Sequence, residues 1–265
     1  MNNEIITLNN ITKFFPVYDE NIVHNEQARD GKFYALDDIS LSIGNGDCVI
    51  IAGANGSGKS LLMAIIAGLE NPSSGTVKTA GRIGLVFQEP DAQILGETPV
   101  EDIAFGPRNM GLSKEEIHAR VDLALNETGL AERKDFPARS LSGGEKRRLA
   151  AAGVLAMDAQ IIIFDEPYAN MDFPGVAQVN RLFQKLITDG KTLIILTHEL
   201  EKCLALANRF IVLFKGKKVF DGNAKEALSL NPEPGIKGED PPFSKWGIHH
   251  PLCNPARELG DLLWL

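Results

Sequence analysis

The chain has 265 residues, of which 44% are hydrophobic and 23% charged, so it can bury a core of its own without disulfides or metal ions. Its 27 basic and 35 acidic residues give a formal net charge of −8, which disfavours nucleic acid or an anionic lipid surface as a partner. Cys48, Cys203 and Cys253 are widely spaced and form no CxxC pair, so neither a disulfide framework nor a zinc site is encoded.

The N-terminal segment carries two stretches in which apolar and polar residues alternate, at Ile5–Phe15 and Ile39–Ile43. This alternation predicts half-exposed strands of an antiparallel β subdomain. Residues 16–33 between them are polar and unusually numerous for a connection, and we expect them to form a long loop.

Five short apolar runs are rich in β-branched residues and are bounded by turn residues. Their continuous hydrophobicity predicts strands that are buried on both faces, as in a parallel sheet covered by helices. Stretches with helical periodicity alternate with these runs, so the sequence predicts an α/β fold. The predicted strands are Cys48–Ala52, Ile83–Phe87, Ile161–Phe164, Leu193–Leu196 and Phe210–Leu213, and the predicted helices are Ser60–Gly68, Lys114–Thr128, Gly143–Met157 and Gly175–Asp189.

The segment between the predicted strands at Ile83 and Ile161 is too long for an ordinary crossover and carries helical periodicity. We therefore expect a helical subdomain over residues 89–157, inserted into a domain that spans residues 1–230. Residues 231–265 begin with several Pro and Gly residues and end with apolar residues. This composition predicts a linker followed by a short docking segment.

The segment Gly53–Ser60 fits the pattern GxxxxGK[ST] and lies between a predicted strand and a predicted helix, which is the context that a phosphate-binding loop requires. Its glycines allow backbone N–H groups to surround phosphates, and the following helix adds its positive N-terminal end. Lys59 is expected to reach the β- and γ-phosphates, and the Ser60 hydroxyl is a predicted Mg²⁺ ligand. The predicted nucleotide contacts of this loop are Gly53, Asn55, Gly56, Ser57, Gly58, Lys59 and Ser60.

Two carboxylates, Asp165 and Glu166, directly follow the apolar run of residues 161–164. They are therefore expected at the carboxyl edge of a buried strand, where open α/β sheets bind their ligands. Asp165 is a predicted Mg²⁺ ligand. Glu166 is a candidate general base that accepts a proton from an attacking water molecule.

A third motif, with Ser142, Gly143 and Gly144 at its centre, is expected to open a helix whose N–H groups and hydroxyl bind an anion, although the same residues also suit an ordinary N-cap. Together the three motifs resemble the Walker A, signature and Walker B sequences of the nucleotide-binding subunit of an ABC transporter. The resemblance extends from about residue 5 to residue 229. It implies a P-loop NTPase core with an N-terminal antiparallel β subdomain, an inserted helical subdomain and a short C-terminal tail, and it implies ATP and Mg²⁺ as ligands.

The same resemblance implies roles for residues outside the three motifs. Gln88 matches the glutamine that contacts Mg²⁺ and water at the joint with the helical subdomain. His198 matches the switch histidine that contacts the γ-phosphate. Phe15 is the candidate for the aromatic side chain that stacks on adenine, and Tyr18 is the alternative.

Three stretches, Gly84–Gln93, Glu101–Pro107 and Lys146–Met157, closely resemble the ATPase of energy-coupling factor (ECF) transporters, which import vitamins and transition-metal ions in prokaryotes. Glu145 replaces the glutamine common there, and Pro99 interrupts the usual Thr-Val. The resemblance implies that two ATPases, identical or paralogous, pair with a transmembrane T component and a substrate-binding S component. The chain is then expected at the cytoplasmic face of the cell membrane.

The predicted function is ATP hydrolysis that energises such an importer through a head-to-tail dimer with ATP sandwiched at two sites. The alternatives are the ATPase of another ABC importer or exporter class, and a soluble ABC ATPase that acts on DNA or ribosomes. A GTPase is disfavoured because the sequence has no NKxD-type motif. The longest apolar run, Leu61–Ala67, is too short to span a bilayer, so we expect the chain to reach the membrane through a partner, and we expect no nucleic-acid partner.

Overall fold

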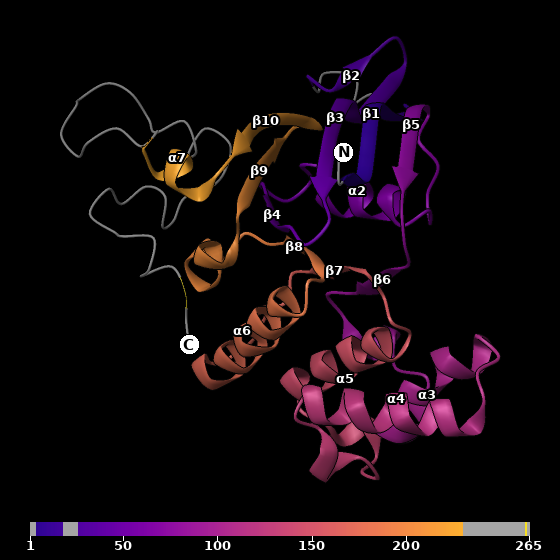
Figure 1. Ribbon diagram of the computed structural model, residues 1–265. Coiled ribbons are helices and arrows are strands. Elements are labelled where there is room, and N and C mark those ends of the chain that lie inside the picture. Colours follow the sequence, from indigo (N-terminus) through magenta and orange to yellow (C-terminus); the bar gives the residue numbers. More distant parts are fainter. Residues whose placement is uncertain (1–3, 18–25, 230–262, 264–265) are drawn as a thin grey trace. The chain divides into compact units, whose positions relative to one another are not determined.

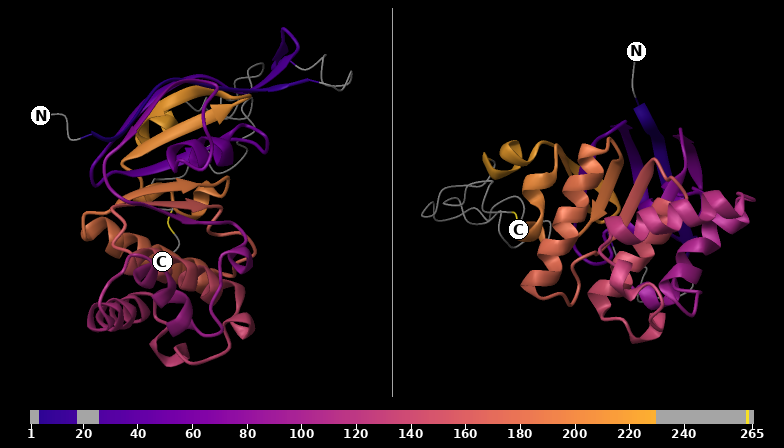
Figure 2. Two further views of the ribbon diagram at one scale, coloured as in Figure 1. Left: turned by 90° about the vertical axis from the view of Figure 1, so that its right-hand side faces the viewer. Right: turned by 60° about the horizontal axis from the view of Figure 1, so that its bottom comes forward.

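The computed structural model describes residues 4–17, 26–229 and 263. The chain forms two compact units, the first made of residues 1–80 and 196–263 and the second of residues 81–195 and 264–265. Both units combine strands with helices (Figures 1 and 2), so the predicted α/β fold class is confirmed.

The first unit contains a four-stranded sheet in the order β2-β3-β1-β5 (Figure 1). Each neighbouring pair is antiparallel, with Leu8 opposite Leu41 and Ile11 opposite Ile39. These four side chains are buried. The predicted antiparallel strands near the N-terminus are therefore confirmed. Their bounds are Glu4–Pro16 for β1, Ala28–Arg29 for β2, Lys32–Gly44 for β3 and Ser74–Thr79 for β5.

Part of the predicted loop 16–33 and all of β5 differ from the sequence prediction. β3 begins at Lys32 rather than Ile39, because Phe33 continues the pairing opposite Phe15. Asp38 has φ 56°, and the pairing register shifts in this region, which interrupts the alternation of apolar residues. β5 has only one apolar residue, Val77, so an edge strand of this kind leaves no hydrophobic pattern.

The first unit also contains a parallel pair, β4 (Cys48–Ala52) and β9 (Arg209–Phe214), which confirms the predicted strands there. All five residues of β4 are buried, and burial raises the pKa of the Cys48 thiol to about 12. β10 (Lys217–Gly222) forms a hairpin with β9 through Lys215 and Gly216, which both have positive φ. The helices among the described residues of this unit are α2 (Lys59–Ile66) and α7 (Ala224–Ser229), with single 3₁₀ turns at Leu200–Lys202 and Leu204–Leu206.

The second unit contains the strands β6 (Ile83–Val86) and β7 (Ile161–Asp165) and all but the last residue of β8 (Thr192–Leu196), in the order β8-β7-β6. β6 and β7 are parallel, and every residue of β7 and β8 is buried, as the continuous apolar runs predict. α6 spans Phe173–Thr188 and begins two residues before the predicted start. Asp172 caps it by accepting a hydrogen bond from the Gly175 N–H at 3.0 Å, and a proline is tolerated in the first turn of a helix.

Residues 87–160 contain three helices and no strand, as their periodicity predicts. The helices pack around a core of their own, in which Ile103, Leu130 and Leu149 are fully buried; Figures 1 and 2 both show them as one group. Helical periodicity in the sequence did not predict α3 as a separate helix. Its start nevertheless carries two helix-start signals, Thr98 as the N-cap and a proline as the first helical residue. Their bounds are Pro99–Asn109 for α3, Lys114–Glu127 for α4 and Gly143–Ala156 for α5, with single 3₁₀ turns at Pro90–Ala92, Ala131–Arg133 and Ala138–Ser140.

We expect Leu149→Ala to lower the free energy of unfolding by about 2–5 kcal/mol, because the truncation leaves a cavity in the core of the three helices. Denaturant titration followed by circular dichroism measures this change. Leu123→Ala on α4 is the matched control: Leu123 is 59% exposed, so its truncation should change the free energy by less than about 0.5 kcal/mol. Equal effects of the two substitutions would contradict this assignment of the core.

Candidate functional site

The phosphate loop of residues 53–60 connects β4 to α2, and two glycines determine its path. Gly53 has φ 153° and Gly58 has φ 102°, conformations that residues with a side chain rarely adopt. A Cβ atom at Gly53 would lie 2.2 Å from the carbonyl oxygen of Leu213, and one at Gly58 would lie 2.9 Å from that of Ala35. The loop approaches its neighbours so closely at these two positions that only glycine fits.

Lys59 is the first residue of α2, and its side chain folds back over the loop. Its Nζ atom donates hydrogen bonds to the carbonyl oxygens of Gly53 at 2.6 Å and of Ala54 at 3.3 Å. The residue is only 7% exposed. The ammonium group therefore lies within the curl of the loop, where it can stabilise the negative charge of a bound phosphate.

The start of α2 suits an anion in two further respects. Its first turn contains no acidic residue and its N-cap, Gly58, provides no side-chain hydrogen bond, so backbone N–H groups are left for a ligand. The Ser57 hydroxyl is buried and has no hydrogen-bond partner among the described residues, whereas Ser60 is exposed. An uncapped helix start beside an unsatisfied hydroxyl is the arrangement that a bound phosphate would complete.

Asp165 and Glu166 lie in the second unit, at the carboxyl end of β7. Both residues are buried, with exposed fractions of 8% and 7%. Glu166 has φ 46°, a left-handed conformation that is uncommon for a residue with a side chain. Such backbone strain is found at functional sites, where the surrounding structure holds a side chain in one direction.

Gln88 and Glu166 lie at the same edge of the sheet in the second unit. β6 and β7 are parallel with Val86 opposite Phe164, and Gln88 and Glu166 each follow that pair by two residues. The carboxyl ends of neighbouring parallel strands thus bring together a predicted Mg²⁺ contact and the predicted general base.

Two side chains that received no role from the sequence hold the segment around Gln88. The Gln93 amide donates a hydrogen bond to the carbonyl oxygen of Leu85 at 2.7 Å and accepts one from the Phe87 N–H at 3.2 Å. Arg147 on α5 donates to the carbonyl oxygen of Gln88 at 3.3 Å. Bonds between a side chain and a distant backbone group leave no local sequence pattern, so only the structure identifies these positioning residues.

Ser142 is the N-cap of α5, and it forms a capping box with Glu145. The Ser142 hydroxyl accepts a hydrogen bond from the Glu145 N–H at 3.3 Å, and the Glu145 carboxylate accepts one from the Ser142 N–H at 2.8 Å. The hydrogen bond from the Ser142 N–H is the largest cause of the lowered pKa of the Glu145 carboxyl group. The segment is therefore an ordered helix start, and Gly143 has open space around its Cα, so a ligand can approach its backbone.

His198 is exposed and lies in the first unit, directly after Thr197. The Thr197 N–H donates to the carbonyl oxygen of Ile51 in β4 at 3.3 Å, and the Thr197 hydroxyl accepts a hydrogen bond from the Glu199 N–H at 3.0 Å. β4 also leads into the phosphate loop. The loop and His198 are thus attached to the same buried strand.

Phe15 lies near the end of β1 and is 43% exposed. Its ring faces the Lys13 ammonium group at 5.4 Å, and its backbone pairs with Phe33 of β3. An exposed aromatic ring on a rigid strand can stack on a nucleotide base. Tyr18, the alternative, lies outside the described residues, as does the predicted tail 231–265 apart from residue 263.

In the described part of the chain, no helix is long and apolar enough to cross a membrane. In the same residues, no group of three or more His, Cys, Asp or Glu side chains is placed to hold a metal ion.

Comparison with known proteins adds to this geometry. Residues 36–169 match the family model described as ABC transporter. A cobalt import ATP-binding protein, CbiO, of Rhodobacter capsulatus is 39% identical over 214 residues, which cover 75% of this chain and 76% of that protein. An energy-coupling factor transporter ATP-binding protein of Methanospirillum hungatei is 40% identical over 210 residues, 74% of this chain; the chain spans about half the length of that relative, 53%.

Solved structures of ATP-binding cassettes share the fold. The structure of cbiO1 from Clostridium perfringens, described as part of the ABC transporter complex cbiONQ, superposes with a TM-score of 0.74 and 33% identity, over 86% of this chain and 91% of that one. A dimeric cassette bound to ADP and Pi in a post-hydrolysis state gives a TM-score of 0.70 and 27% identity, over 82% of this chain and 98% of that one.

Proposed function

Because the chain belongs to the ABC transporter family, as an ATP-binding subunit that hydrolyses ATP, we propose that it energises an importer of the ECF type for a vitamin or a transition-metal ion. The observation that carries this proposal is its likeness to ATP-binding proteins named for energy coupling and for cobalt import, over about three quarters of the chain. The phosphate loop after β4 supports the proposal, since its close-packed glycines and the uncapped start of α2 suit the phosphates of ATP.

In this proposal Mg²⁺ accompanies ATP, and Ser60, Asp165 and Gln88 hold the ion. A hydroxyl, a carboxylate and an amide provide the oxygen ligands that Mg²⁺ prefers. When bound, the ion neutralises charge on the phosphates. The open start of α2 and the exposed Ser60 hydroxyl support this assignment from the side of the phosphate loop.

The protein side chains then divide the work of hydrolysis. Lys59 binds the β- and γ-phosphates, and the N–H groups of the loop hold their oxygens. Glu166 accepts the proton of the attacking water, and His198 contacts the γ-phosphate. The left-handed backbone of Glu166 and the attachment of Thr197 to β4 support these roles, because both features restrain the backbone from which the side chain of Glu166 or of His198 projects.

The proposed active form is a head-to-tail dimer. One chain carries one phosphate loop and one Ser142–Gly144 segment, and in the proposal the segment of one chain completes the ATP site of the other. The ordered helix start at Ser142 supports this arrangement, since it presents N–H groups to a phosphate from outside the chain. The partner is a second copy or a paralogous ATPase.

We propose that the membrane partner, a T component with its S component, binds the groove beside Gln88. A groove of about 900 Å³ runs along Asp91, Ile94, Leu95, Glu97 and Pro137. Leu95 is 66% exposed, and the groove combines apolar side chains with acidic ones and with the basic side chains of Arg139 and Lys146, which suits an amphipathic helix with charged residues on its polar face. The chain would then act at the cytoplasmic face of the membrane, as an ATPase domain (1–230) with an inserted helical subdomain (89–157) and a docking or dimerisation segment (231–265).

Replacement of the proposed base should separate ATP binding from hydrolysis. In Glu166→Gln the amide keeps the volume of the carboxyl group but cannot take up the proton, so we expect steady-state turnover to fall by about 100-fold or more while ATP affinity stays within about twofold. Glu132→Gln, on an exposed 3₁₀ turn, is the control and should hydrolyse ATP at the normal rate. Normal turnover in Glu166→Gln would remove Glu166 from this role.

A mixture of two inactive variants tests the shared site. Lys59→Ala disables the phosphate loop of its own chain, and Ser142→Arg blocks the site of the partner, so each homodimer should be nearly inactive. Random mixing rebuilds one complete site in half of the dimers, and we expect roughly a quarter of the normal ATPase activity if one site turns over alone. Substantial activity of purified Ser142→Arg would contradict the sandwich arrangement.

Assembly with the membrane components tests the proposed importer. We expect Leu95→Asp to reduce copurification of the ATPase with its membrane subunits by about tenfold or more, since a charge in the groove opposes burial of an apolar helix face. Leu123→Asp, at an equally exposed leucine on α4, is the matched control. The ATPase rate of the isolated chain should be unchanged in both. Copurification that survives Leu95→Asp but not Leu123→Asp would place the partner elsewhere.

A further inference from the structure

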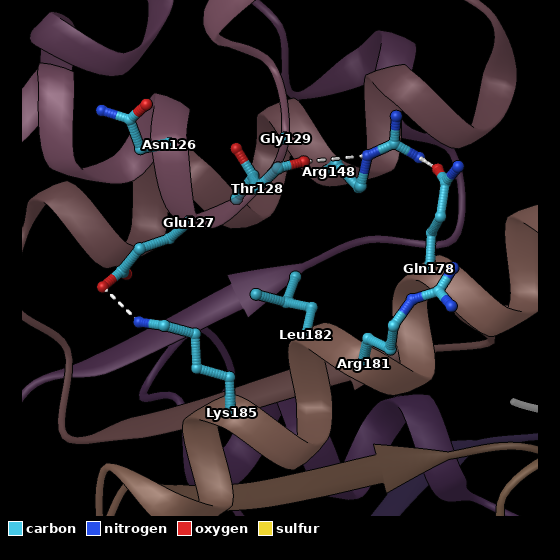
Figure 3. Close-up of a pocket in the computed structure, with 9 residues that line it drawn as sticks. All are labelled: Asn126, Glu127, Thr128, Gly129, Arg148, Gln178, Arg181, Leu182 and Lys185. Carbon is cyan, nitrogen blue, oxygen red and sulfur yellow. Dashed lines mark hydrogen bonds and ion pairs between the residues drawn. The ribbon is translucent and has the colours of Figure 1, made fainter.

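A pocket of about 440 Å³ lies in the second unit between the end of α4, α5 and α6 (Figure 3). This volume falls within the roughly 300–1,000 Å³ that small-molecule sites occupy. Its walls include Glu127 and Thr128 of the α4 end, Arg148 of α5, and Gln178, Arg181 and Lys185 of α6. None of these residues belongs to the proposed ATP site, so the pocket is a separate feature.

The pocket carries an excess of positive charge in an acidic chain. Its lining includes three cationic side chains and a single carboxylate, that of Glu127. The Lys185 ammonium group bonds Glu127 at 2.5 Å and Asp189 at 3.3 Å, so its charge is already balanced. The guanidinium groups of Arg148 and Arg181 therefore account for the excess, although the formal net charge of the chain is −8.

Arg148 is half-buried, and it donates hydrogen bonds to two neutral acceptors. Its Nε atom donates to the carbonyl oxygen of Thr128 at 3.0 Å, and an Nη atom donates to the side-chain oxygen of Gln178. Burial lowers the pKa of this guanidinium, which means that its charge is incompletely solvated. The negative charge of Glu145 opposes this lowering of the Arg148 pKa, but the Glu145 carboxylate forms its ion pair with Arg133, at 3.4 Å. A negative group in the pocket would stabilise the Arg148 charge.

Arg181 supplies the second guanidinium from the opposite wall. It lies three residues after Gln178 on α6, so the two side chains project from the same face of the helix. Figure 3 draws both on the wall of the pocket that faces Arg148. Arginine presents forked N–H donors that match the oxygens of a phosphate or a carboxylate.

We propose that this pocket binds a compact, soluble oxyanion with two or more negative charges, of the phosphate type, between Arg148 and Arg181. A lipid headgroup fits less well, because the apolar side chain among the lining residues, that of Leu182, is buried and so offers an acyl chain no exposed contact within the pocket. The Gln178 amide, which already accepts from Arg148, would contribute a further donor.

The bound anion would restrain two helices that the ATPase uses, and this part of the proposal rests on the proposed function. α5 starts at the Ser142 segment, six residues before Arg148, and α6 starts a few residues after Glu166. A ligand that bridges Arg148 and Arg181 therefore links α5, which begins at the proposed signature, to α6, which follows the proposed base in the sequence. Restraint of that joint should slow turnover.

Binding is tested first, by calorimetric titration of inorganic phosphate into the full-length chain. A saturating non-hydrolysable ATP analogue with Mg²⁺ fills the phosphate loop, and sodium chloride of equal ionic strength serves as the blank. We expect one phosphate per chain, with affinity reduced about tenfold or more in Arg181→Gln. Arg108→Gln, at an exposed arginine near the end of α3, is the matched control and should bind normally. Absence of phosphate binding to the unaltered chain, or equal weakening in both variants, would overturn the site.

The effect on turnover is tested second. At saturating ATP, phosphate that fills the pocket should slow hydrolysis by the unaltered chain by about twofold or more, and should slow Arg181→Gln less. If phosphate binds as expected but slows both proteins equally, the regulatory part is wrong and the site remains. Because binding is measured without turnover, failure of the proposed transport function would leave the binding result unaffected.

Discussion

The structure depends on strands β4 and β7, which are buried along their whole length. Water does not reach their backbone N–H and C=O groups, so these groups must bond to neighbouring strands and the register is fixed. The phosphate loop starts at the residue after β4, and Glu166 is the residue after β7. The phosphate loop and Glu166, which we assign to ATP, thus each follow the end of a fully buried strand, and these strand ends set their positions.

The starts of the helices differ in how many backbone N–H groups they leave for a ligand. α4 and α5 both begin with a capping box, formed by Ser113 with Glu116 and by Ser142 with Glu145. Each box satisfies N–H groups internally and places a carboxylate in the first turn. α2 has neither feature, so its N–H groups and its positive end stay available for an anion. The box of α5 uses only the N–H groups of Ser142 and Glu145, so those of Gly143 and Gly144 can still meet an anion, whereas α2 keeps its whole first turn for one.

Glu145 illustrates how one residue affects both cap and ligand. Its carboxylate forms the same bond to the Ser142 N–H that a glutamine would form, so the helix start is preserved. The hydrogen bond holds the pKa of Glu145 below its usual range, and the side chain therefore stays charged near the proposed phosphate contact. Arg133, at 3.4 Å, offsets part of that charge. The departure from glutamine is compatible with the cap and adds a local electrostatic cost for an anion.

The sequence by itself determined the features that rest on local pattern. The continuous apolar run Cys48–Ala52 gave the bounds of β4 to the residue, and the GxxxxGK[ST] spacing identified a loop that the structure shows to be shaped around Gly53 and Gly58. The capping residues of α5 fixed its start at Gly143, where helical periodicity also predicts it.

Only the tertiary structure decided the rest. β5 pairs at a sheet edge with one apolar residue, β3 extends through a bulge at Asp38, and Asp172 starts α6 before the predicted residue. The anchor of Gln93 and the pocket between Arg148 and Arg181 join residues that are distant in sequence. Periodicity records which face of an element is buried, but it does not record which side chains meet there, because that depends on how separate elements pack.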